Sequence, residues 1–498
     1  SALAGQGLGA NIRKAEYEKL QSYSFSNIDH FSVSSLVTRL TSDVTNIQNA
    51  VSTGMRPFGR SPVMLIFATS FAFRINSTLA LVFLVALPTL AVLLILIIIN
   101  VGPLYGRMQS AIDQVNRCIQ ENLTAIRVVK SYVRGDYEVE KFGVVNENLK
   151  SESEKAFGTA VLNMPAMQFV MYGTILGILL IGGRLINEGQ MMIGQLTSFL
   201  SYVLLILNSL MMMSNVFLLM TRSLASAERI MEVIDEKIDI TDENAKDIAV
   251  AKGEIEFDHV WFKYKDTAKE YVLSDVSFHI KPGQTVGIIG QTGSSKTTLV
   301  QLIPRLYDVT KGEVKIDGIN VKEYPVRHLR DAVAMVLQKN TLFSGSLIDN
   351  LRWGNENATL DEIKEACQIA CVDEFVDRLA DGYDTEMGQE GVNVSGGQKQ
   401  RICIARAILK KPKVLILDDS TSAVDTATEA KIRSGLAEKL PDMTKIIIAQ
   451  RISSVRHADQ IIIMDRGHVE AIGTHESLLR DNQIYQEIYA SQKEGADL

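Results

Sequence analysis

Four motifs in the second half of the chain carry side chains that can bind and act on a nucleotide. Residues 290–298 read GQTGSSKTT, which has the glycine, lysine and hydroxyl spacing of a phosphate-binding loop. Further along, residues 394–398 read VSGGQ, residues 414–419 read VLILDD and residues 446–454 read IIIAQRISS. Together these motifs predict a site for ATP.

The phosphate-binding loop supplies most of the expected contacts. Gly290 and Gly293 allow the tight turns that let backbone N–H groups surround phosphates. Lys296 is expected to bridge the β- and γ-phosphates, and Thr297 to ligate Mg²⁺. The strand TVGIIG precedes the loop and a helix over 296–307 follows it, so the positive end of the helix adds to phosphate binding. The remaining loop residues expected to contact ATP are Gln291, Thr292, Ser294, Ser295 and Thr298.

The run VLILDD is apolar and ends in two acids, which is typical of a buried strand that delivers carboxylates to its end. Asp418 is the expected Mg²⁺ partner, through water or a hydroxyl. Burying acids that have no role would cost free energy, so this run also favours a ligand site. A Gly- and Ser-rich loop without a ligand is the alternative for residues 290–298, and it leaves VLILDD unexplained.

The first 222 residues differ in composition from the rest of the 498-residue chain. A helix needs roughly 20 apolar residues to cross a bilayer. Uncharged runs of at least that length cover Thr78–Val101, Ala156–Gly183 and Gly189–Thr221, and a shorter run at Ser61–Phe73 is expected to span by extending toward Val51. We therefore predict about four membrane helices. The net charge of −7 shows no basic excess, so no nucleic-acid partner is expected.

The charges between these runs predict the orientation in the membrane. The links Arg74–Ser77 and Arg184–Gln190 are short, whereas a long helical stretch over Tyr105–Lys155 is rich in Arg and Lys. The positive-inside rule places that stretch in the cytoplasm, together with the soluble half of the chain. The sequence predicts a multi-pass protein of the cytoplasmic membrane whose soluble domain lies in the cytoplasm, the compartment that contains ATP.

The soluble half begins after an acidic segment that is poor in large apolar residues. We predict an all-α membrane domain over 1–234, a linker over 235–252 and an α/β domain over 253–498. In the last domain, alternating strand signals such as IEFDHVWFKY give way to strands that alternate with helices. This order is typical of an α/β fold whose ligands bind at the carboxyl ends of the strands.

With these motifs in this order, the whole chain resembles the ATP-binding cassette (ABC) exporters of the type IV fold. The resemblance implies that Tyr264 stacks on adenine and that Gln338, in MVLQKNTLF, touches Mg²⁺. It also implies that VSGGQ is the signature that grips the γ-phosphate of ATP bound to the opposite cassette, and that Ser422–Asp425, ending in Asp425, is a loop that crosses between cassettes. Two cassettes of this family sandwich two ATP molecules. The signature residues are Ser395, Gly396, Gly397 and Gln398.

The resemblance also implies six membrane helices and two cytoplasmic coupling helices in each chain. Since four spans are found here, roughly one and a half helices are expected to be missing from the start. The best matches to the coupling helices are Asn27–Ser32 and Val133–Lys141. Membrane domain first and cassette second is the exporter layout.

Three positions depart from the pattern of the family. Asp419 stands where a Glu polarises the attacking water, and its carboxylate would lie about 1.5 Å further back, a misplacement that can cost ~100-fold in rate. Gln450 stands where a His holds the γ-phosphate, and an amide carries neither proton nor charge. Ser295 replaces the Gly before Lys296 and adds a side chain close to the phosphates.

These departures lead to the hypothesis of a heterodimer with unequal sites, similar to bacterial heterodimeric multidrug exporters. This chain would bind ATP and Mg²⁺ at a poorly hydrolysing site, in which Asp419 and Gln450 are degenerate catalytic residues, and a different half-transporter would supply the Glu and His. The uncharged spans favour lipophilic or amphipathic substrates. The alternatives are a regulatory ATP-binding subunit that gates a transporter, a slow homodimer, and an exporter of lipids or peptides.

Overall fold

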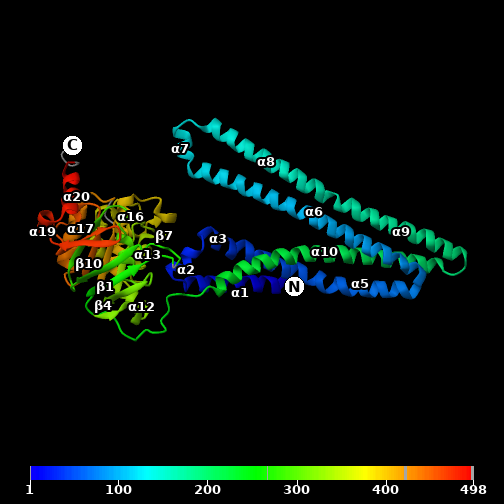
Figure 1. The fold of residues 1–498 in the computed structure, drawn as a ribbon, viewed down its shortest axis with the longest axis horizontal. Helices are drawn as coiled ribbons and strands as arrows, with labels where there is room; N and C mark the ends of the chain where they lie inside the picture. The colour runs from blue at the N-terminus through cyan, green and yellow to red at the C-terminus, as the bar shows by residue number, and fades with distance from the viewer. Residues whose placement is uncertain (1, 266, 420–422, 495–498) are drawn as a thin grey trace. The chain divides into compact units, whose positions relative to one another are not determined.

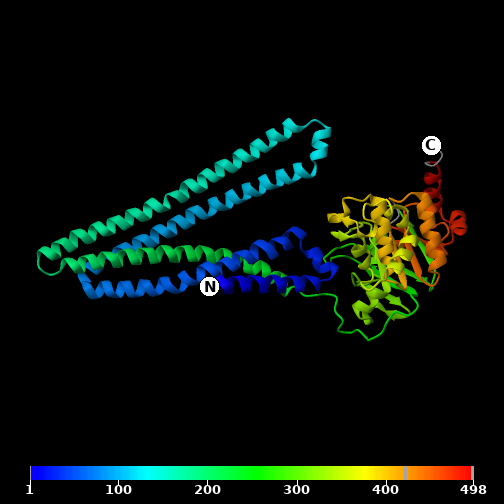
Figure 2. The same cartoon turned by 180° about the vertical axis from the view of Figure 1, so that it is seen from behind.

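The structure is a computed structural model that describes residues 2–265, 267–419 and 423–494. It confirms the predicted fold class, a helical domain followed by an α/β domain (Figures 1 and 2). The chain divides into two units: residues 1–17 with 37–234, and residues 18–36 with 235–498. The second unit therefore includes a short segment from near the start of the chain.

The helical part consists of long helices joined by short links. Its elements are α1 (Ala2–Gln21), α2 (Phe25–His30), α3 (Val33–Thr38), η1 (Arg39–Asp43), α4 (Val44–Asn49), η2 (Ala50–Gly54), α5 (Met55–Ile75), α6 (Ser77–Thr124), α7 (Ile126–Ser131), α8 (Gly135–Val161), α9 (Asn163–Asn187) and α10 (Ile193–Asp235). Helix α6 lies along α8 and α9, as both ribbon views show.

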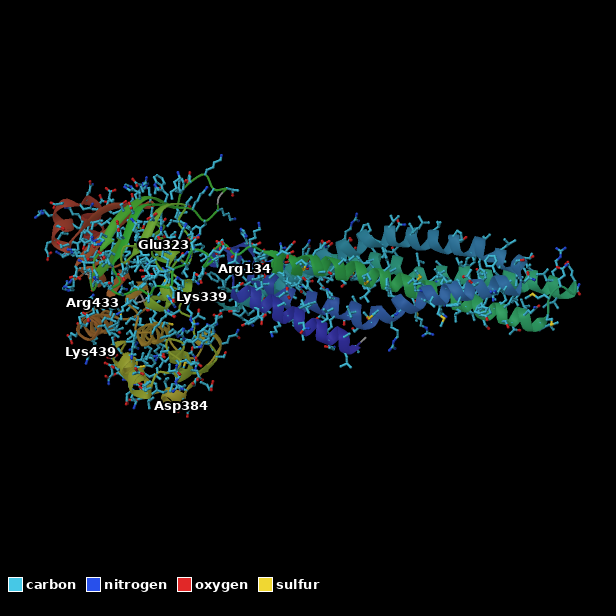
Figure 3. All side chains as sticks on the ribbon, turned by 90° about the horizontal axis from the view of Figure 1, so that it is seen from below. Arg134, Glu323, Lys339, Asp384, Arg433 and Lys439 are labelled. Carbon is cyan, nitrogen blue, oxygen red and sulfur yellow. The ribbon has the colours of Figure 1, made fainter. Side chains whose placement is uncertain are left out.

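Two of the four predicted membrane spans fall in α5 and α6, the third runs from the end of α8 into α9, and the fourth begins in the link before α10 and continues along that helix. Among the described residues, two segments are long and apolar enough to cross a membrane, Gln168–Asn187 and Ile193–Met213. Buried apolar side chains from these helices form one cluster, which includes Phe83, Phe199 and Ile206. Carbon atoms dominate the side chains along the long helices in Figure 3, whereas nitrogen and oxygen are dense over the α/β part.

The predicted helical stretch over Tyr105–Lys155 is helical but interrupted at two places. Helix α6 ends at Thr124, the short helix α7 follows, and α8 begins only at Gly135. Val133 has a φ of 54°, which a β-branched residue rarely adopts and which ends the helical path. The predicted second coupling helix, Val133–Lys141, thus starts in this turn and continues into α8. The short separate helix of this region is α7, which precedes the turn.

The first predicted coupling helix begins two residues earlier than expected. The Ser24 hydroxyl accepts a hydrogen bond from the Asn27 N–H, and the Asn27 side chain accepts one from the Ser24 N–H. This reciprocal cap starts α2 at Phe25, and the helix ends at His30.

Charged side chains join α1, η1 and α10 in the first unit. Asp43 accepts hydrogen bonds from Arg229 Nε at 2.8 Å and from Ser226 Oγ at 2.9 Å. Glu16 of α1 lies beside them and is fully buried, and in the described part of the chain neither of its carboxylate oxygens has a hydrogen-bond partner. Burial, with the Asp43 charge adding to it, raises the pKa of Glu16 to about 7.

The α/β unit contains an antiparallel sheet in the order β2-β1-β4-β5 and a second sheet in the order β12-β11-β3-β10-β9-β6. Its strands are β1 (Ile255–Phe262), β2 (Leu273–Ile280), β3 (Thr285–Gly290), β4 (Lys311–Ile316), β5 (Ile319–Asn320), β6 (Val333–Val336), β7 (Gly345–Ser346), β8 (Glu386–Met387), β9 (Val414–Asp418), β10 (Thr444–Ile448), β11 (Gln460–Asp465) and β12 (His468–Gly473). In the second sheet all neighbouring pairs are parallel except β11 with β12.

The parallel sheet separates two cores, because alternate side chains of its strands belong to opposite clusters. One core packs β1, β2 and β4 against the buried face of β3, and the other joins β9 and β10 to the helices that follow Gly345. The helices and short turns of this unit are α11 (Lys296–Gln301), η3 (Val321–Glu323), α12 (Val326–Ala332), α13 (Leu347–Arg352), α14 (Leu360–Ile369), α15 (Asp373–Val376), η4 (Gly382–Asp384), η5 (Gln389–Gly391), α16 (Gly396–Leu409), α17 (Thr426–Lys439), α18 (Ile452–Val455), α19 (His475–Asp481) and α20 (Gln483–Glu494).

Candidate functional site

The carboxyl ends of three neighbouring parallel strands bring the predicted ATP-site residues together. In the register of the sheet, Ile448 at the end of β10 is opposite Asp418 of β9 on one side and Ile288 of β3 on the other. The loop after β3, the acids after β9 and the residues after β10 therefore emerge at one edge, where α/β proteins bind ligands.

These residues line a cavity of about 310 Å³. The lining residues are Thr292, Gly293, Ser294, Ser295, Lys296, Thr297, Thr298, Gln338, Asp418, Asp419, Ile448 and Gln450. Of the predicted positions, the structure thus gathers loop residues 292–298, Gln338, both acids and Gln450 in one place, whereas Gly290 and Gln291 are not among the lining residues. Ile448 is an addition that the sequence did not single out, since it reads as an ordinary apolar strand residue.

The side chain of Lys296 hydrogen-bonds the phosphate-binding loop that precedes it. Lys296 Nζ donates hydrogen bonds to the carbonyl oxygens of Gly290 and Gln291, both at 2.8 Å, and to Ser294 Oγ at 3.2 Å. Burial lowers the pKa of the Lys296 ammonium, although the Asp419 and Asp418 charges act in the opposite direction. Keeping the ammonium charged in the cavity therefore costs free energy, because it has lost part of its contact with water. A bound anion would offset that cost.

Two positions in the loop are sensitive to a side chain. A Cβ on Gly290 would lie 2.2 Å from the Met464 carbonyl oxygen, so only glycine fits there. Ser295 has φ of 70° and ψ of 25°, the left-handed conformation. That conformation costs a residue with a Cβ roughly 1–2 kcal/mol, so the serine at this position strains the loop.

Asp418 and Thr297 form the part of the site that suits a cation. Thr297 Oγ1 donates to Asp418 Oδ1 at 3.0 Å, while Asp418 Oδ2 is buried and has no hydrogen-bond partner among the described residues. Burial raises the pKa of Asp418, although the Thr297 bond acts in the opposite direction. A hydroxyl, a buried carboxylate and the Gln338 amide fit the oxygen-only ligand set that Mg²⁺ prefers.

Asp419 and Gln450 contact each other across the cavity. Gln450 Nε2 donates to Asp419 Oδ2 at 2.8 Å. Burial raises the pKa of Asp419, and hydrogen bonds from Gln450 and Gln338 oppose that rise. Asp419 has a φ of 49°, a left-handed conformation that aspartate tolerates better than most residues. The two positions expected to handle water and γ-phosphate are therefore occupied by a carboxylate and an amide that satisfy each other.

Tyr264 lies next to the loop rather than inside the cavity. Its hydroxyl is 2.8 Å from Thr298 Oγ1, and 44% of the residue is exposed. Its ring meets the Tyr307 ring edge-on, with centroids 5.2 Å apart. This leaves a partly open aromatic face beside the phosphate loop, as a residue that stacks on adenine requires.

The described residues of the signature and of the crossing loop are not among those that line this cavity. Ser395 caps α16, accepting a bond from the Gln398 N–H at 3.3 Å and donating its own N–H to Gln398 Oε1 at 2.8 Å. Asp425 caps α17 by accepting from the Thr428 N–H at 3.0 Å. None of Ser395, Gly396, Gly397, Gln398 and Asp425 lines the cavity, and Ser422 lies outside the described residues. The signature, at the N-terminus of α16, is thus not part of the lining of this chain's own cavity.

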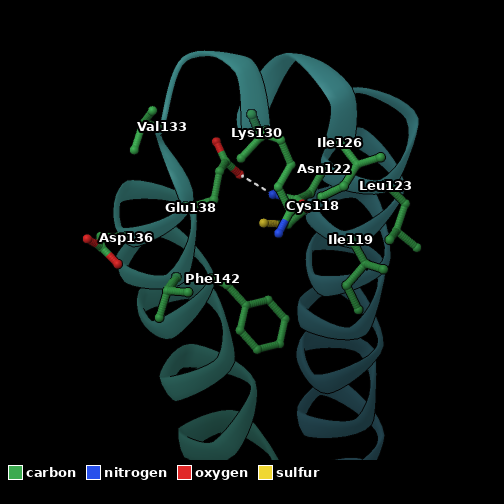
Figure 4. Close-up of a pocket in the computed structure, with 13 residues that line it drawn as sticks. Cys118, Ile119, Asn122, Leu123, Ile126, Lys130, Val133, Asp136, Glu138 and Phe142 are labelled. Atoms are coloured by element: carbon green, nitrogen blue, oxygen red, sulfur yellow. Dashed lines mark hydrogen bonds between the residues drawn. The ribbon is translucent and has the colours of Figure 1, made fainter.

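A second cavity, of about 570 Å³, lies between the ends of α6, α7 and α8 (Figure 4). Its lining is mostly apolar, with Ile119, Leu123 and Phe142, and the Asn122 amide donates to Glu138 at 3.1 Å across it. It collects none of the predicted site residues.

Comparison with known proteins identifies both parts of the chain. The family described as ABC transporter transmembrane region matches residues 1–210, and the family described as ABC transporter matches residues 273–422. An uncharacterized ABC transporter ATP-binding protein of Bacillus subtilis, YfiB, is 40% identical over 100% of this chain and 86% of its own length.

Two further relatives have names that state an activity. The putative multidrug export ATP-binding/permease protein YgaD of Bacillus subtilis is 33% identical over 97% of this chain and 83% of its own length. The ATP-dependent lipid A-core flippase of Desulfotalea psychrophila is 32% identical, over 98% and 85% respectively.

A solved structure is similar across both parts of the chain. It is that of a bacterial Atm1-family ABC exporter with ATP bound, with a TM-score of 0.86 and 25% identity over 98% of this chain and 86% of the other. With a transmembrane region, a cassette that has the phosphate loop at its strand ends, and relatives that match it along its whole length, this chain is a membrane ABC exporter half-transporter whose ATP-binding domain lies on the cytoplasmic side.

Proposed function

We propose that this chain is the degenerate-site subunit of a heterodimeric ABC exporter. One observation carries the proposal: the positions for the catalytic Glu and His hold Asp419 and Gln450, which hydrogen-bond to each other at 2.8 Å. An amide cannot accept a proton or carry a charge, and a carboxylate set back by one methylene is poorly placed to orient water. ATP held here would be split slowly.

The loop and its neighbours are proposed to bind ATP and Mg²⁺ in the roles expected from the sequence. Lys296 would contact the β- and γ-phosphates, and Tyr264 would lie against the adenine. Thr297, Gln338 and Asp418 would hold Mg²⁺, which would neutralise phosphate charge. Asp418 Oδ2, which is buried and has no hydrogen-bond partner among the described residues, supports this assignment.

The signature is proposed to serve the ATP of the other subunit. Residues 395–398 keep the pattern of a competent signature, and they lie outside this chain's own cavity. The partner would be a second, different half-transporter with a Glu and a His at the matching positions. ATP bound here would keep the cassettes together while hydrolysis at the partner's loop, against this signature, drives the cycle.

The proposed substrates are lipophilic or amphipathic compounds. The predicted spans over Ala156–Gly183 and Gly189–Thr221 hold polar but uncharged side chains, including Gln168, Tyr172 and Gln195. Such residues bind amphipathic molecules without the cost of a bare charge in the membrane. The relative named for multidrug export supports drugs, and the relative named as a lipid A-core flippase supports lipids.

Purification of the native complex tests the proposal. We expect one other ABC chain to co-purify in equal amount, with a Glu and a His where this chain has Asp419 and Gln450. Purification of copies of this chain alone, active in export, would instead establish a homodimer. A complex that binds ATP and gates transport without any turnover would establish a regulatory subunit.

A further inference from the structure

Tyr307 connects the phosphate loop to helix α2. Its hydroxyl donates a hydrogen bond to Asp29 Oδ2 at 2.8 Å, and its ring contacts the Phe25 ring at 6.0 Å between centroids. On the other side, its ring packs edge-on against Tyr264 at 5.2 Å, with an angle of 88° between the planes. Tyr264 in turn hydrogen-bonds Thr298 of α11. All these residues belong to the second unit.

The contact is buried and directional. Tyr307 is only 8% exposed, and Phe262 packs against both tyrosine rings. Burial, strengthened by the bond to Asp29, raises the pKa of Tyr307, so the phenol remains a hydrogen-bond donor at any physiological pH. Because side chains in close-packed contact cannot move independently, a change in the Tyr264 ring must be accommodated at Tyr307.

Helix α2 also contacts the segment that follows α10, for example between His30 and Glu236. The Asn27 side chain donates to the Lys237 carbonyl oxygen at 2.8 Å and to Glu236 at 3.2 Å, and Ser26 hydrogen-bonds Asp239. These partners belong to the segment that enters the α/β unit, not to the nucleotide site. Tyr307 thus joins α2 to residues beside the phosphate loop, through its hydrogen bond to Asp29 and its ring contact with Phe25.

We propose that Tyr307 is a positioning residue that transmits occupancy of the adenine platform at Tyr264 to helix α2 through Asp29. The proposal rests on the proposed ATP site. A purine ring on Tyr264 fixes that ring, Tyr307 packs against the fixed ring, and the bond to Asp29 holds α2 in one position. Without the purine, the Tyr264 ring and α2 are both freer to move.

A second tyrosine provides a matched control. Tyr324 is also buried in this unit, and its hydroxyl donates to the Ile316 carbonyl oxygen at 2.9 Å. Its hydroxyl bond makes no connection to α2 or to Tyr264. Tyr324→Phe and Tyr307→Phe both remove one buried phenol hydrogen bond, so a general loss of stability affects both variants alike.

The test is hydrogen exchange of the amides of Phe25–Phe31 in the purified native complex, with and without MgATP. In the wild type and in Tyr324→Phe, we expect MgATP to slow exchange by about fivefold or more. Fivefold is about the lower limit of the change that coupling between two sites usually produces. In Tyr307→Phe we expect ATP affinity to stay within about twofold and the slowing to disappear. Asp29→Ala should behave like Tyr307→Phe, and combining the two should add nothing further.

The proposal is overturned if α2 responds to MgATP equally in Tyr307→Phe and the wild type, or if the wild type shows no response. A different result would show that Tyr264 does not bind adenine. In that case Tyr264→Ala would leave ATP affinity unchanged, and the adenine platform on which this proposal rests would not exist. In all cases a normal unfolding temperature of each variant shows that the comparison is between folded proteins.

Discussion

Gln450 donates a 2.8 Å hydrogen bond from Nε2 to Asp419 Oδ2 inside the cavity that the phosphate loop lines. The two residues come from the ends of β9 and β10, which are parallel neighbours. Their contact joins the acid that would orient water to the group that would hold the γ-phosphate. The amide and the carboxylate satisfy each other, and neither offers the proton chemistry of a Glu and His pair.

Replacing both residues should restore hydrolysis at this site. In the double variant Asp419→Glu, Gln450→His, the carboxylate reaches about 1.5 Å further and the imidazole can carry a charge, so turnover here should rise by up to about 100-fold. The measurement is MgATPase activity of the complex in which the partner's own catalytic Glu has been changed to Gln. A double variant with no more activity than that background would mean that these two positions do not limit hydrolysis.

Ser295 provides a test of strain in the loop. Because its φ is 70°, Ser295→Gly should raise the free energy of unfolding by about 1 kcal/mol and leave ATP binding equal or tighter. Thermal unfolding and ATP titration of the full chain measure both effects. Ser294→Gly is the control, since it removes a buried hydroxyl that accepts from Lys296 and should lower stability. A less stable Ser295→Gly would show that the serine side chain makes a contact that outweighs the strain.

The signature glycines should differ in what they disturb. A Cβ at Gly397 would lie 2.7 Å from the Ala423 carbonyl oxygen, whereas one at Gly396 would meet its nearest neighbour at 3.6 Å. Gly397→Ala should therefore lower the stability of the cassette by about 1–3 kcal/mol, the usual range for overpacking. Gly396→Ala should fold normally and reduce hydrolysis only in the complex, where the signature meets the partner's ATP. Equal unfolding temperatures for the two variants would contradict this reading.

Much of this site could be predicted because its chemistry depends on short, local patterns. The loop, Asp418 and the VSGGQ segment each lie at the end of a strand or the start of a helix, and local sequence specifies those positions. The helix after the loop was predicted to reach residue 307, but α11 ends at Gln301, before Pro304, and Arg305 has a φ of 50°. Proline disfavours a helical residue before it, which shortens the helix.

Contacts between distant parts of the chain could not be predicted. Nothing in the sequence near Tyr307 indicates that Asp29, 278 residues earlier, accepts its hydrogen bond. The break at Val133, by contrast, does have a local signal, because residues 131–133 are weak helix formers and Gly135 follows them. Helix pairing and side-chain burial of this kind depend on tertiary structure, which overrides local preference.

Glu16 predicts a pH dependence of stability in the helical domain. Its pKa is raised to about 7 in the folded chain, from an ordinary value of 4.5, because it is buried beside Asp43. The folded state thus binds a proton that the unfolded state releases, so stability falls as pH rises from about 4.5 through 7. The groups that face Glu16 are Arg13 of its own helix and Arg39 and Asp43 of η1.

Glu16→Gln should remove this dependence. The amide is neutral at every pH, so the variant should be more stable than the wild type at pH 8, by on the order of 1–3 kcal/mol, and similar to it at pH 5. Thermal unfolding of the full chain in detergent across this range is the measurement. Glu232→Gln, at a site where the carboxylate is largely exposed and paired with Arg39, is the control and should not change the slope between pH 5 and 8. The prediction would be contradicted if the unfolding temperatures of Glu16→Gln and of the wild type changed with pH by the same amount.

Steady-state MgATPase activity of this chain purified without any partner, in lipid, distinguishes a degenerate site from a competent one when ATP binding is measured alongside. We expect ATP to bind and its turnover to be about 100-fold or more below that of the complete complex. A turnover of about 1 s⁻¹ or faster, within the range of ordinary enzymes, from this chain alone would contradict this expectation.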